Sequence, residues 1–296
     1  HPRTFSGGLF LREEWRPTAT LGVTGDLAWR HQDYFMRDDV FGGNRFDQGY
    51  DFALPRLGVS WRPREDMTLF GSWSYGQREP RFVDLFKGER VPAVAYYGVY
   101  DPANGIAEDP LVRPEKVSDF ELGGAYSAGG VRASVNLFRM DFRDELVDFQ
   151  FNPDFYDWVT TNAARSLHQG VELAVAAEAR PRGGLALALD ANATLSDNHF
   201  VDFDEQLDPV TSVSRDGRSI GFFPRTIANA GARLSWNGAR LGAEAQHAGE
   251  IFLDNGEDPG GRIAPRTVLN LSLGFSRALG GGEAALVVRV LNALDA

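Results

Sequence analysis

Apolar and polar residues alternate along most of the chain, and helical periodicity is almost absent. The longest alternating stretch covers the 12 residues 185–196, where the odd positions are Leu or Ala and the even positions are small or polar. The same alternation recurs over 67–75, 171–178 and 269–275. Strands of soluble β-sandwiches are usually about 5–6 residues long. Longer strands with one apolar face fit a sheet that crosses a hydrocarbon layer.

The spacing of these stretches predicts twelve strands, joined by connectors that alternate between short and long. The strands are expected at 5–15, 19–32, 50–62, 66–77, 117–127, 130–145, 162–179, 184–197, 224–236, 239–252, 264–277 and 283–293. Short turns follow at 16–18, 63–65, 127–129, 180–183, 237–238 and 278–282, and long loops at 33–49, 78–116, 146–161, 198–223 and 253–263. Outer-membrane barrels have short periplasmic turns and long extracellular loops, an order that a soluble β-protein has no reason to keep. The chain is therefore predicted to be all-β, part of an antiparallel transmembrane β-barrel.

The alternation also predicts which side chains face lipid. Large aromatic residues stand on the apolar positions just before five of the six short turns: Trp15, Trp61, Tyr126, Trp236 and Phe275. Aromatic residues gather at the membrane interface in barrels, whereas in a soluble sandwich they would fill the middle of the core. We expect Leu69, Trp73, Leu187, Leu189, Leu271 and Leu273 on the outer wall, and Ser72, Asp190, Asn192 and Ser272 on the inner one.

Composition excludes several classes of protein. The 296 residues contain no cysteine, so disulfides, thiol nucleophiles and cysteine-bound metals are excluded. No segment approaches 18 consecutive apolar residues, which excludes a helical membrane protein. The net charge of -11 argues against nucleic acid as a partner, because phosphate binding needs clustered Lys and Arg.

Five short motifs then appear in order along the chain: GQREPRFVDLF at 76–86, DPLVRPEKVSDFELG at 109–123, FRMDFRDELV at 138–147, NAARSLHQGVE at 162–172 and VLNALD at 290–295. Together they resemble the β-barrel of TonB-dependent outer-membrane receptors, although Ala293 stands where that family has Phe or Leu. The resemblance implies a barrel of about 22 strands plugged by an N-terminal domain. It also implies import of a scarce ligand with energy from TonB, an inner-membrane partner.

The plug, its energy-coupling box, about ten strands of such a barrel and its last strand have no counterpart in the sequence. Residues 1–296 are thus expected to be the C-terminal portion of the barrel, from its tenth strand onward. Such a piece would leave unpaired edges at 5–15 and 283–293 and form an open half-pipe. A continuous ladder between its first and last strands would instead indicate a complete small barrel.

No catalytic constellation is expected. The five histidines, His1, His31, His168, His199 and His247, lie far apart and in no metal-ligand spacing. Two acidic loops, 202–208 and 254–258, could bind Ca²⁺ through carboxylates, or could simply be solvated loop tips. No enzyme activity and no cofactor are predicted.

Ligand contacts are expected on the long loops, because binding residues concentrate on loops held by a rigid scaffold. The candidates are Arg81, Tyr96, Tyr97, Tyr100, Phe155, Tyr156 and Trp158. Arginine can pair with carboxylate or hydroxamate-type oxygens, and aromatic rings can stack on a planar ligand. The alternative is that these aromatic residues pack the loops against one another.

The leading functional hypothesis is a monomeric receptor in the outer membrane of a Gram-negative bacterium. It would lie in lipid, bind TonB through its plug, and import an iron–siderophore complex, a cobalamin-like ligand or a saccharide. One alternative is a self-contained twelve-stranded outer-membrane enzyme of the lipase or protease type. Another is a soluble β-rich binding module, whose apolar faces would be buried inside.

Overall fold

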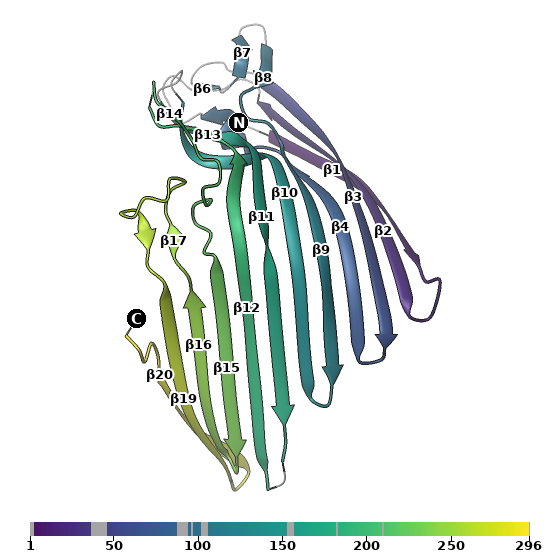
Figure 1. Cartoon of the computed structure of the whole chain (residues 1–296), viewed down its shortest axis with the longest axis vertical. Helices are drawn as coiled ribbons and strands as arrows, with labels where there is room; N and C mark the ends of the chain where they lie inside the picture. Colours follow the sequence, from purple (N-terminus) through teal and green to yellow (C-terminus); the bar gives the residue numbers. More distant parts are fainter. Residues whose placement is uncertain are drawn as a thin grey trace.

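The computed structural model describes residues 3–36, 46–87, 94–95, 97–101, 106–152, 157–181, 183–208 and 210–295. Its main feature is one antiparallel sheet of 12 strands (Figure 1). In spatial order these are β1 (Arg3–Trp15), β2 (Leu21–Met36), β3 (Phe46–Arg64), β4 (Met67–Arg78), β9 (Glu115–Ala128), β10 (Val131–Asn152), β11 (Asp157–Ala179), β12 (Leu185–Asp202), β15 (Thr226–Trp236), β16 (Ala239–Ala248), β19 (Arg266–Leu279) and β20 (Gly282–Val290). Each predicted strand is confirmed, and each pairs with the next along the chain.

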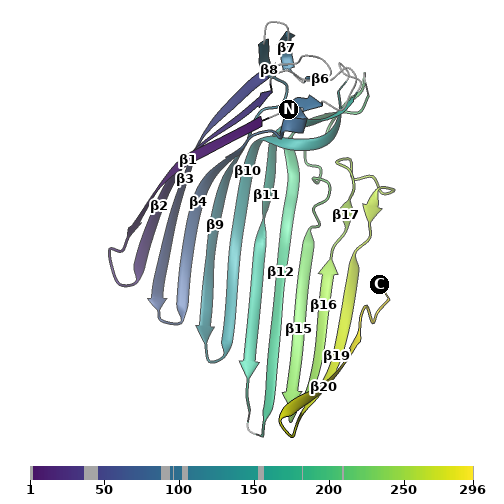
Figure 2. The ribbon, with the colours of Figure 1, turned by 180° about the vertical axis from the view of Figure 1, so that it is seen from behind.

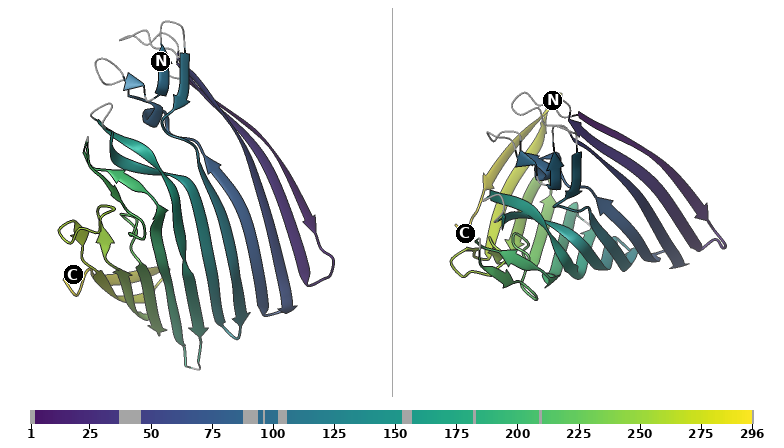
Figure 3. Two further views of the ribbon diagram at one scale, coloured as in Figure 1. Left: turned by 45° about the horizontal axis from the view of Figure 1, so that its top comes forward. Right: turned by 90° about the horizontal axis from the view of Figure 1, so that it is seen from above.

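The sheet curves into an open trough rather than closing on itself (Figures 2 and 3). In the described part of the chain β1 pairs with β2 alone and β20 with β19 alone, so the two edges are not joined. The half-pipe expectation is confirmed. No ladder of the kind that a complete twelve-stranded barrel requires links the first and last of the described strands.

One face of the trough carries a continuous apolar belt. Directly opposed residues point to the same side of a sheet, and apolar pairs connect all of the neighbouring strands. The pairs are Leu11–Leu27, Val23–Val59, Trp61–Leu69, Trp73–Phe120, Leu122–Leu137, Val135–Leu173, Val171–Leu195, Leu187–Leu234, Leu234–Leu241, Leu241–Leu273 and Leu273–Val288. Such a belt is typical of a lipid-facing barrel wall.

The aromatic residues before the short turns belong to this same face. Trp15, Trp61, Tyr126, Trp236 and Phe275 are between 43% and 62% exposed, so they do not form a buried core. The alternative of a soluble β-rich binding module predicted instead that the apolar faces would be buried inside the protein. The outward facing of Leu69, Trp73, Leu187, Leu189, Leu271 and Leu273 is confirmed by the register.

The opposite face is polar and lies on the inner side of the curve. Ser72 opposes Glu121, Asn192 opposes Asn229, and Ser272 opposes Arg289. Two aromatic rings on this face lie over glycines of the next strand. A Cβ added to Gly123 would meet the ring of Phe70 at 2.4 Å, and one added to Gly170 would meet Phe138 at 2.9 Å. The missing side chains therefore make room for these rings, which shield the exposed backbone.

Small elements cover the long-loop end of the trough. They are α1 (Phe82–Leu85), β5 (Phe86–Lys87), β6 (Val94–Ala95), β7 (Tyr97–Asp101), β8 (Ile106–Pro110), β13 (Asp204–Gln206), β14 (Ser212–Ser214), β17 (Ile251–Phe252) and β18 (Arg262–Ile263). The α1–β8 elements lie over the inner side of the trough (Figure 3). A cluster of buried residues, Val147, Ala163, Phe200, Phe203 and Ile220, packs beneath β13 and β14. The core is therefore at the loop end and not between two sheets.

The boundaries differ from the predicted ones at this end. The predicted strand 239–252 ends at Ala248, and Ile251–Phe252 pairs with Arg262–Ile263 instead. Several strands run further than predicted at this end: β10 to Asn152, β11 from Asp157, β12 to Asp202, β2 to Met36 and β3 from Phe46. The alternation of apolar and polar residues does not mark these strand ends, because neither face of the extensions contacts a wide apolar phase. None of the described residues forms a helix long and apolar enough to span a bilayer.

Arginine introduced at Leu189 tests the facing of the belt. Leu189 opposes Ala177 and Ala232 on the apolar face, and is 45% exposed there. We expect Leu189→Arg to lower the free energy of unfolding from lipid vesicles by about 2–4 kcal/mol. The matched control is Ala188→Arg on the inner face, where Ala188 opposes Glu178. Equal losses for the two variants would contradict the assignment of faces.

Candidate functional site

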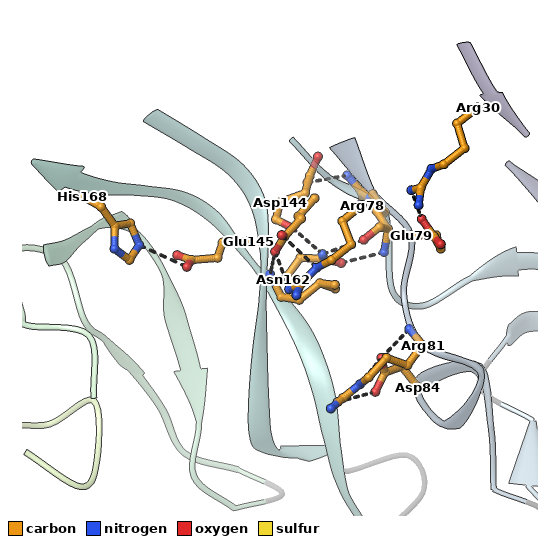
Figure 4. A network of polar contacts seen from close by, with 12 residues as sticks. Arg30, Arg78, Glu79, Arg81, Asp84, Asp144, Glu145, Asn162 and His168 are labelled. Carbon is orange, nitrogen blue, oxygen red and sulfur yellow. Dashed lines mark hydrogen bonds and ion pairs between the residues drawn. The ribbon is translucent and has the colours of Figure 1, made fainter. Parts of the chain in front are cut away.

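The candidate site lies where β4 ends and the chain folds back over the trough (Figure 4). Here the rim segment, residues 79–87, contains α1 and most of the first motif. Pro80 and Leu85 are fully buried, so the segment is a packed part of the structure. It meets side chains from β2, β3, β10 and β11, all at the long-loop end.

Arg81 connects the rim segment to the β10–β11 hairpin. Its Nε and Nη2 donate to the two carboxylate oxygens of Asp84 at 3.0 and 2.8 Å, and its backbone N–H donates to the same carboxylate at 2.7 Å. Nη2 also donates to Asp148 Oδ1 on β10 at 2.6 Å and to Thr160 Oγ1 on β11 at 3.2 Å. Hydrogen bonds to Asp84 raise the pKa of the Arg81 guanidinium further above its ordinary value, with smaller contributions from Asp148. The arginine is therefore permanently charged in this network.

Thr160 completes the connection. Its hydroxyl lies 2.7 Å from Asp84 Oδ1 and 2.6 Å from Asp148 Oδ1. Asp84 is 5% exposed, and its short side chain accepts from two separate elements. A buried carboxylate is tolerated only when it is paired and hydrogen-bonded, as this one is. We call Arg81, Asp84, Asp148 and Thr160 the rim latch.

A second set of contacts holds the rim segment against the first strands of the sheet. The Arg30 guanidinium forms an ion pair with Glu79 and lies 5.0 Å from the centre of the Phe52 ring. The Tyr34 ring makes edge contacts with Tyr50 at 6.4 Å and with Phe82 of α1 at 6.2 Å. Since Arg30, Tyr34 and Phe52 belong to the inner face of β2 and β3, the rim segment covers that face.

Further polar contacts fix the start of β9 against β10 and β11. Arg78 and Glu115 form an ion pair of 2.9 Å, and Glu115 also accepts from the Leu146 backbone at 3.2 Å. The Asn162 amide donates to the backbone oxygens of Arg113 at 2.9 Å and Asp144 at 2.7 Å. These bonds position the 109–115 stretch of the second motif beside the third and fourth.

His168 is buried in a polar and aromatic environment. Its Nε2 lies 3.1 Å from Glu145 Oε1, and Ser166 donates to the other oxygen of Glu145. The imidazole contacts Phe142 at 5.0 Å and Phe223 at 5.3 Å, which brings the 198–223 loop onto the inner face. In this arrangement the carboxylate lies between the hydroxyl and the imidazole, so it does not form a nucleophile–base pair.

The structure places only some of the predicted ligand residues. Arg81 is in the rim latch, and its side chain is nevertheless 60% exposed. Tyr97 is 5% exposed on β7, and Tyr100 lies on the same strand. Trp158 lies on β11, whereas Tyr96, Phe155 and Tyr156 lie outside the described residues. Arg81 connects the predicted loop 78–116 to the predicted loop 146–161, because Asp148 and Thr160 lie within the latter, on the strand extensions of β10 and β11.

Sequence reasoning did not identify Asp84, Asp148 or Thr160. The spacing of Arg81 and Asp84 resembles a capping pair and could have suggested their contact. Asp148 and Thr160 gave no such signal, since they meet the rim segment only through the fold.

In each of the two acidic loops one aspartate caps its own turn, whereas Glu205 accepts from Arg215 and Glu257 from Arg218 and Ser219. Asp208 Oδ1 accepts from the backbone of Val210 and Thr211, both at 2.9 Å, and these bonds lower the pKa of the Asp208 carboxyl. Asp254 Oδ1 accepts from the backbone of Gly256 at 2.6 Å. Within the described ranges no three His, Asp or Glu side chains are grouped to hold a metal ion.

Removing one charge from the latch tests its role. We expect Asp84→Asn to destabilise the rim segment locally by about 2 kcal/mol, roughly a thirty-fold rise in amide exchange over 79–87, because Asp84 accepts charged bonds while buried. Asp148→Asn is the matched control, since Asp148 accepts from the same Nη2 but is 45% exposed. That variant should cost less than about 1 kcal/mol. Equal exchange in the two variants would show that burial of Asp84 does not stabilise the segment. Hydrogen–deuterium exchange measures both.

The chain matches one family over almost all of its length. The family is described as TonB dependent receptor-like, beta-barrel, and its match covers residues 1–293. A comparison with curated proteins found no match.

Solved structures with the same fold include three receptors or transporters. The siderophore receptor PiuA from Acinetobacter baumannii is 14% identical with a TM-score of 0.72, over 100% of this chain and 40% of that one. The ferric citrate transporter FecA is 15% identical with a TM-score of 0.73, over 99% of this chain and 40% of that one. The copper transporter OprC is 14% identical with a TM-score of 0.72, over 99% of this chain and 42% of that one.

The chain thus spans about two fifths of the length of these proteins. At such identities the likeness establishes the fold, while the family match extends across nearly the whole sequence. The protein belongs to the TonB-dependent receptor family, and this chain matches the β-barrel of that family.

Proposed function

We propose that the protein is an outer-membrane receptor that imports a scarce ligand on energy supplied through TonB. The observation that carries this proposal is the two-faced trough of a TonB-dependent receptor barrel: an outer apolar belt across 12 strands, an inner polar wall, and packed elements over its long-loop end. A wall of this kind separates lipid from a polar passage. The rim elements would then stand where a ligand arrives.

The chain would form the C-terminal portion of the barrel, with the plug and the remaining strands elsewhere in the protein. TonB would act through that plug, and the receptor would work as a monomer in the outer membrane of a Gram-negative bacterium. Support comes from the share of the related structures that the chain covers, 40% for both PiuA and FecA. The open edges of β1 and β20 also need partners, because unpaired backbone groups are costly in hydrocarbon.

An iron–siderophore complex is our first proposal for the ligand, followed by a cobalamin-like compound or a saccharide. The printed names of the similar structures include a siderophore receptor, a ferric citrate transporter and a copper transporter. These support a metal chelate as the class of ligand.

The proposed ligand contacts are on two loops, one that follows Asp84 in the sequence and carries Tyr96, Tyr97 and Tyr100, and one between Asp148 and Thr160 that carries Phe155, Tyr156 and Trp158. Tyr97 is 5% exposed, so it would have to become exposed to reach a ligand. Arg81 would hold these loops side by side through Asp148 and Thr160. Among the described residues the hydrogen bonds of its side chain use Nε and Nη2, and 60% of the side chain is exposed. The remaining edge of the guanidinium would be available to an anionic oxygen of the ligand.

Uptake by the complete receptor tests this proposal. The strain should lack other receptors, and the probes are ⁵⁵Fe carried by catecholate, hydroxamate and citrate chelators, labelled cobalamin and a labelled oligosaccharide. We expect one of these probes to accumulate, and accumulation to cease when TonB is deleted. Absence of TonB-dependent accumulation of every probe would contradict import of these classes.

Deleting residues 88–108 from the complete receptor tests the site. The deletion should abolish uptake of the accumulated probe, because it removes the tyrosine loop, and it should leave the barrel strands in place. The control is the heat-resistant folded band of the variant in detergent. Unchanged uptake by the folded variant would show that this loop does not bind the ligand.

A further inference from the structure

Four cations gather on the outer face of the trough, where the apolar belt ends. They are Lys116 on β9, Arg139 and Arg143 on β10, and Arg165 on β11, and we call them the cationic patch. The register places them on the outer side. Arg139 opposes Phe120 of the belt, and the ladder continues without a shift to Arg143, which opposes Lys116.

The depth of the patch follows from the strand that carries Lys116. Tyr126, the aromatic residue beside the short turn, is ten residues further along β9. Ten residues rise by about 34 Å along a strand, or about 25 Å across a bilayer at the usual tilt. That height equals the apolar band of a barrel wall. The row of Lys116, Arg143 and Arg165 therefore lies one band above the periplasmic interface, at the level of the outer headgroups. Arg139, which opposes Phe120, lies four residues nearer that interface.

The patch contains more positive charge than its neighbours neutralise. Arg165 binds Asp141 through two hydrogen bonds of 3.1 and 2.6 Å, and the Lys116 ammonium lies 3.4 Å from Asp144. Arg139 donates to Gln169 at 3.1 Å and lies 4.0 Å from Asp141. Arg143 is exposed, and among the described residues it forms no ion pair. The whole protein chain has a net charge of -11, so such a cluster is unusual for it.

Favourable contacts between neighbouring strands do not explain why these cations lie side by side. Lys116, Arg143 and Arg165 are directly opposed on three neighbouring strands. Like charges in opposed positions destabilise a sheet. Asp141 and Asp144 offset two of these charges, whereas Arg143 forms no ion pair among the described residues and is left for an anion from outside.

The shape of the surface fits such an anion on a lipid. A hollow on this face is lined by the patch residues Lys116, Arg143 and Arg165 together with Tyr75, Ser118, Phe120 and Asp141, whose carboxylate is already bound by Arg165. Immediately below it are exposed apolar side chains of the belt, Phe120, Leu122 and Leu137, at 50% to 62% exposure. Phosphate oxygens would meet the cations, and acyl chains would lie along the belt.

We propose that the cationic patch binds the phosphorylated headgroup of a lipid in the outer leaflet. Arginine suits this task because its planar fork can donate two bonds to one phosphate. The proposal rests on the membrane location proposed above and is independent of the imported ligand. The patch faces away from the passage, so a lipid bound there would leave import open.

The test is lipid binding by the complete receptor in a detergent with an uncharged headgroup, measured by native mass spectrometry. The probes are dioctanoyl phosphatidic acid, dioctanoylglycerol with the same chains but no phosphate, and inorganic phosphate as a competitor. We expect phosphatidic acid to bind more tightly than dioctanoylglycerol. Replacing any one of the arginines should weaken the binding of phosphatidic acid about five-fold. The affinity should therefore fall about a hundred-fold in the triple variant Arg139→Gln, Arg143→Gln and Arg165→Gln.

The control carries three inner-face substitutions, Arg132→Gln, Arg233→Gln and Arg240→Gln, which remove the same charge. Its affinity for phosphatidic acid should be unchanged. Arg143→Gln alone decides the result if the triple patch variant loses its folded band, because Arg143 takes part in no ion pair in the described part of the chain. Three results would overturn the proposal: equal binding of the two lipids, equal losses in patch and control variants, or displacement of the lipid by equimolar inorganic phosphate, which would indicate a site for the free anion.

Discussion

The cross-strand register of one antiparallel sheet determines nearly everything else in this protein. Side chains alternate between the two faces of a strand, so a shift by one residue would exchange the faces of that strand. Eleven successive ladders keep one apolar residue opposite another on the outer side, from Leu11–Leu27 at one edge to Leu273–Val288 at the other. A one-residue slip of β12 would place Asp190 in the apolar belt, and a slip of β16 would place Glu244 there. A charged side chain on the lipid-facing side costs free energy, so the sequence strongly specifies the register of the strand pairs.

The rim depends on the same register. Arg30, Tyr34 and Phe52 meet the rim segment because each belongs to the inner face of its strand. The latch then adds a constraint that no single strand provides, since Asp84, Asp148 and Thr160 come from three elements. The cationic patch is the outward counterpart of the rim. Its Lys116, Arg143 and Arg165 stand on the outward-facing positions of β9, β10 and β11, at the upper end of the apolar belt.

Strands and faces could be predicted from the sequence because a wall between lipid and water imposes alternation on every residue it contains. The positions of Leu189 and Asp190 followed from parity alone. The extensions of β10 and β11 beyond the belt could not be predicted, since both of their faces lack an apolar solvent. Thr160 and Asp84 are 76 residues apart, so their contact depends on the fold and leaves no local pattern. Arg81 was recognised as a candidate from its motif, while the carboxylates that engage it were not.

The central claim is that the odd and even residues of a strand such as β12 face lipid and water respectively. The protein has no cysteine, so single cysteines at positions 186–195 of the complete receptor can each carry a spin label. In lipid vesicles, the accessibility of each label to oxygen and to a water-soluble nickel chelate can be compared by electron paramagnetic resonance. We expect oxygen accessibility to peak at 187, 189, 191, 193 and 195, and accessibility to the nickel chelate to peak at the positions between them. Loss of the two-residue period, or the opposite phase, would contradict the account.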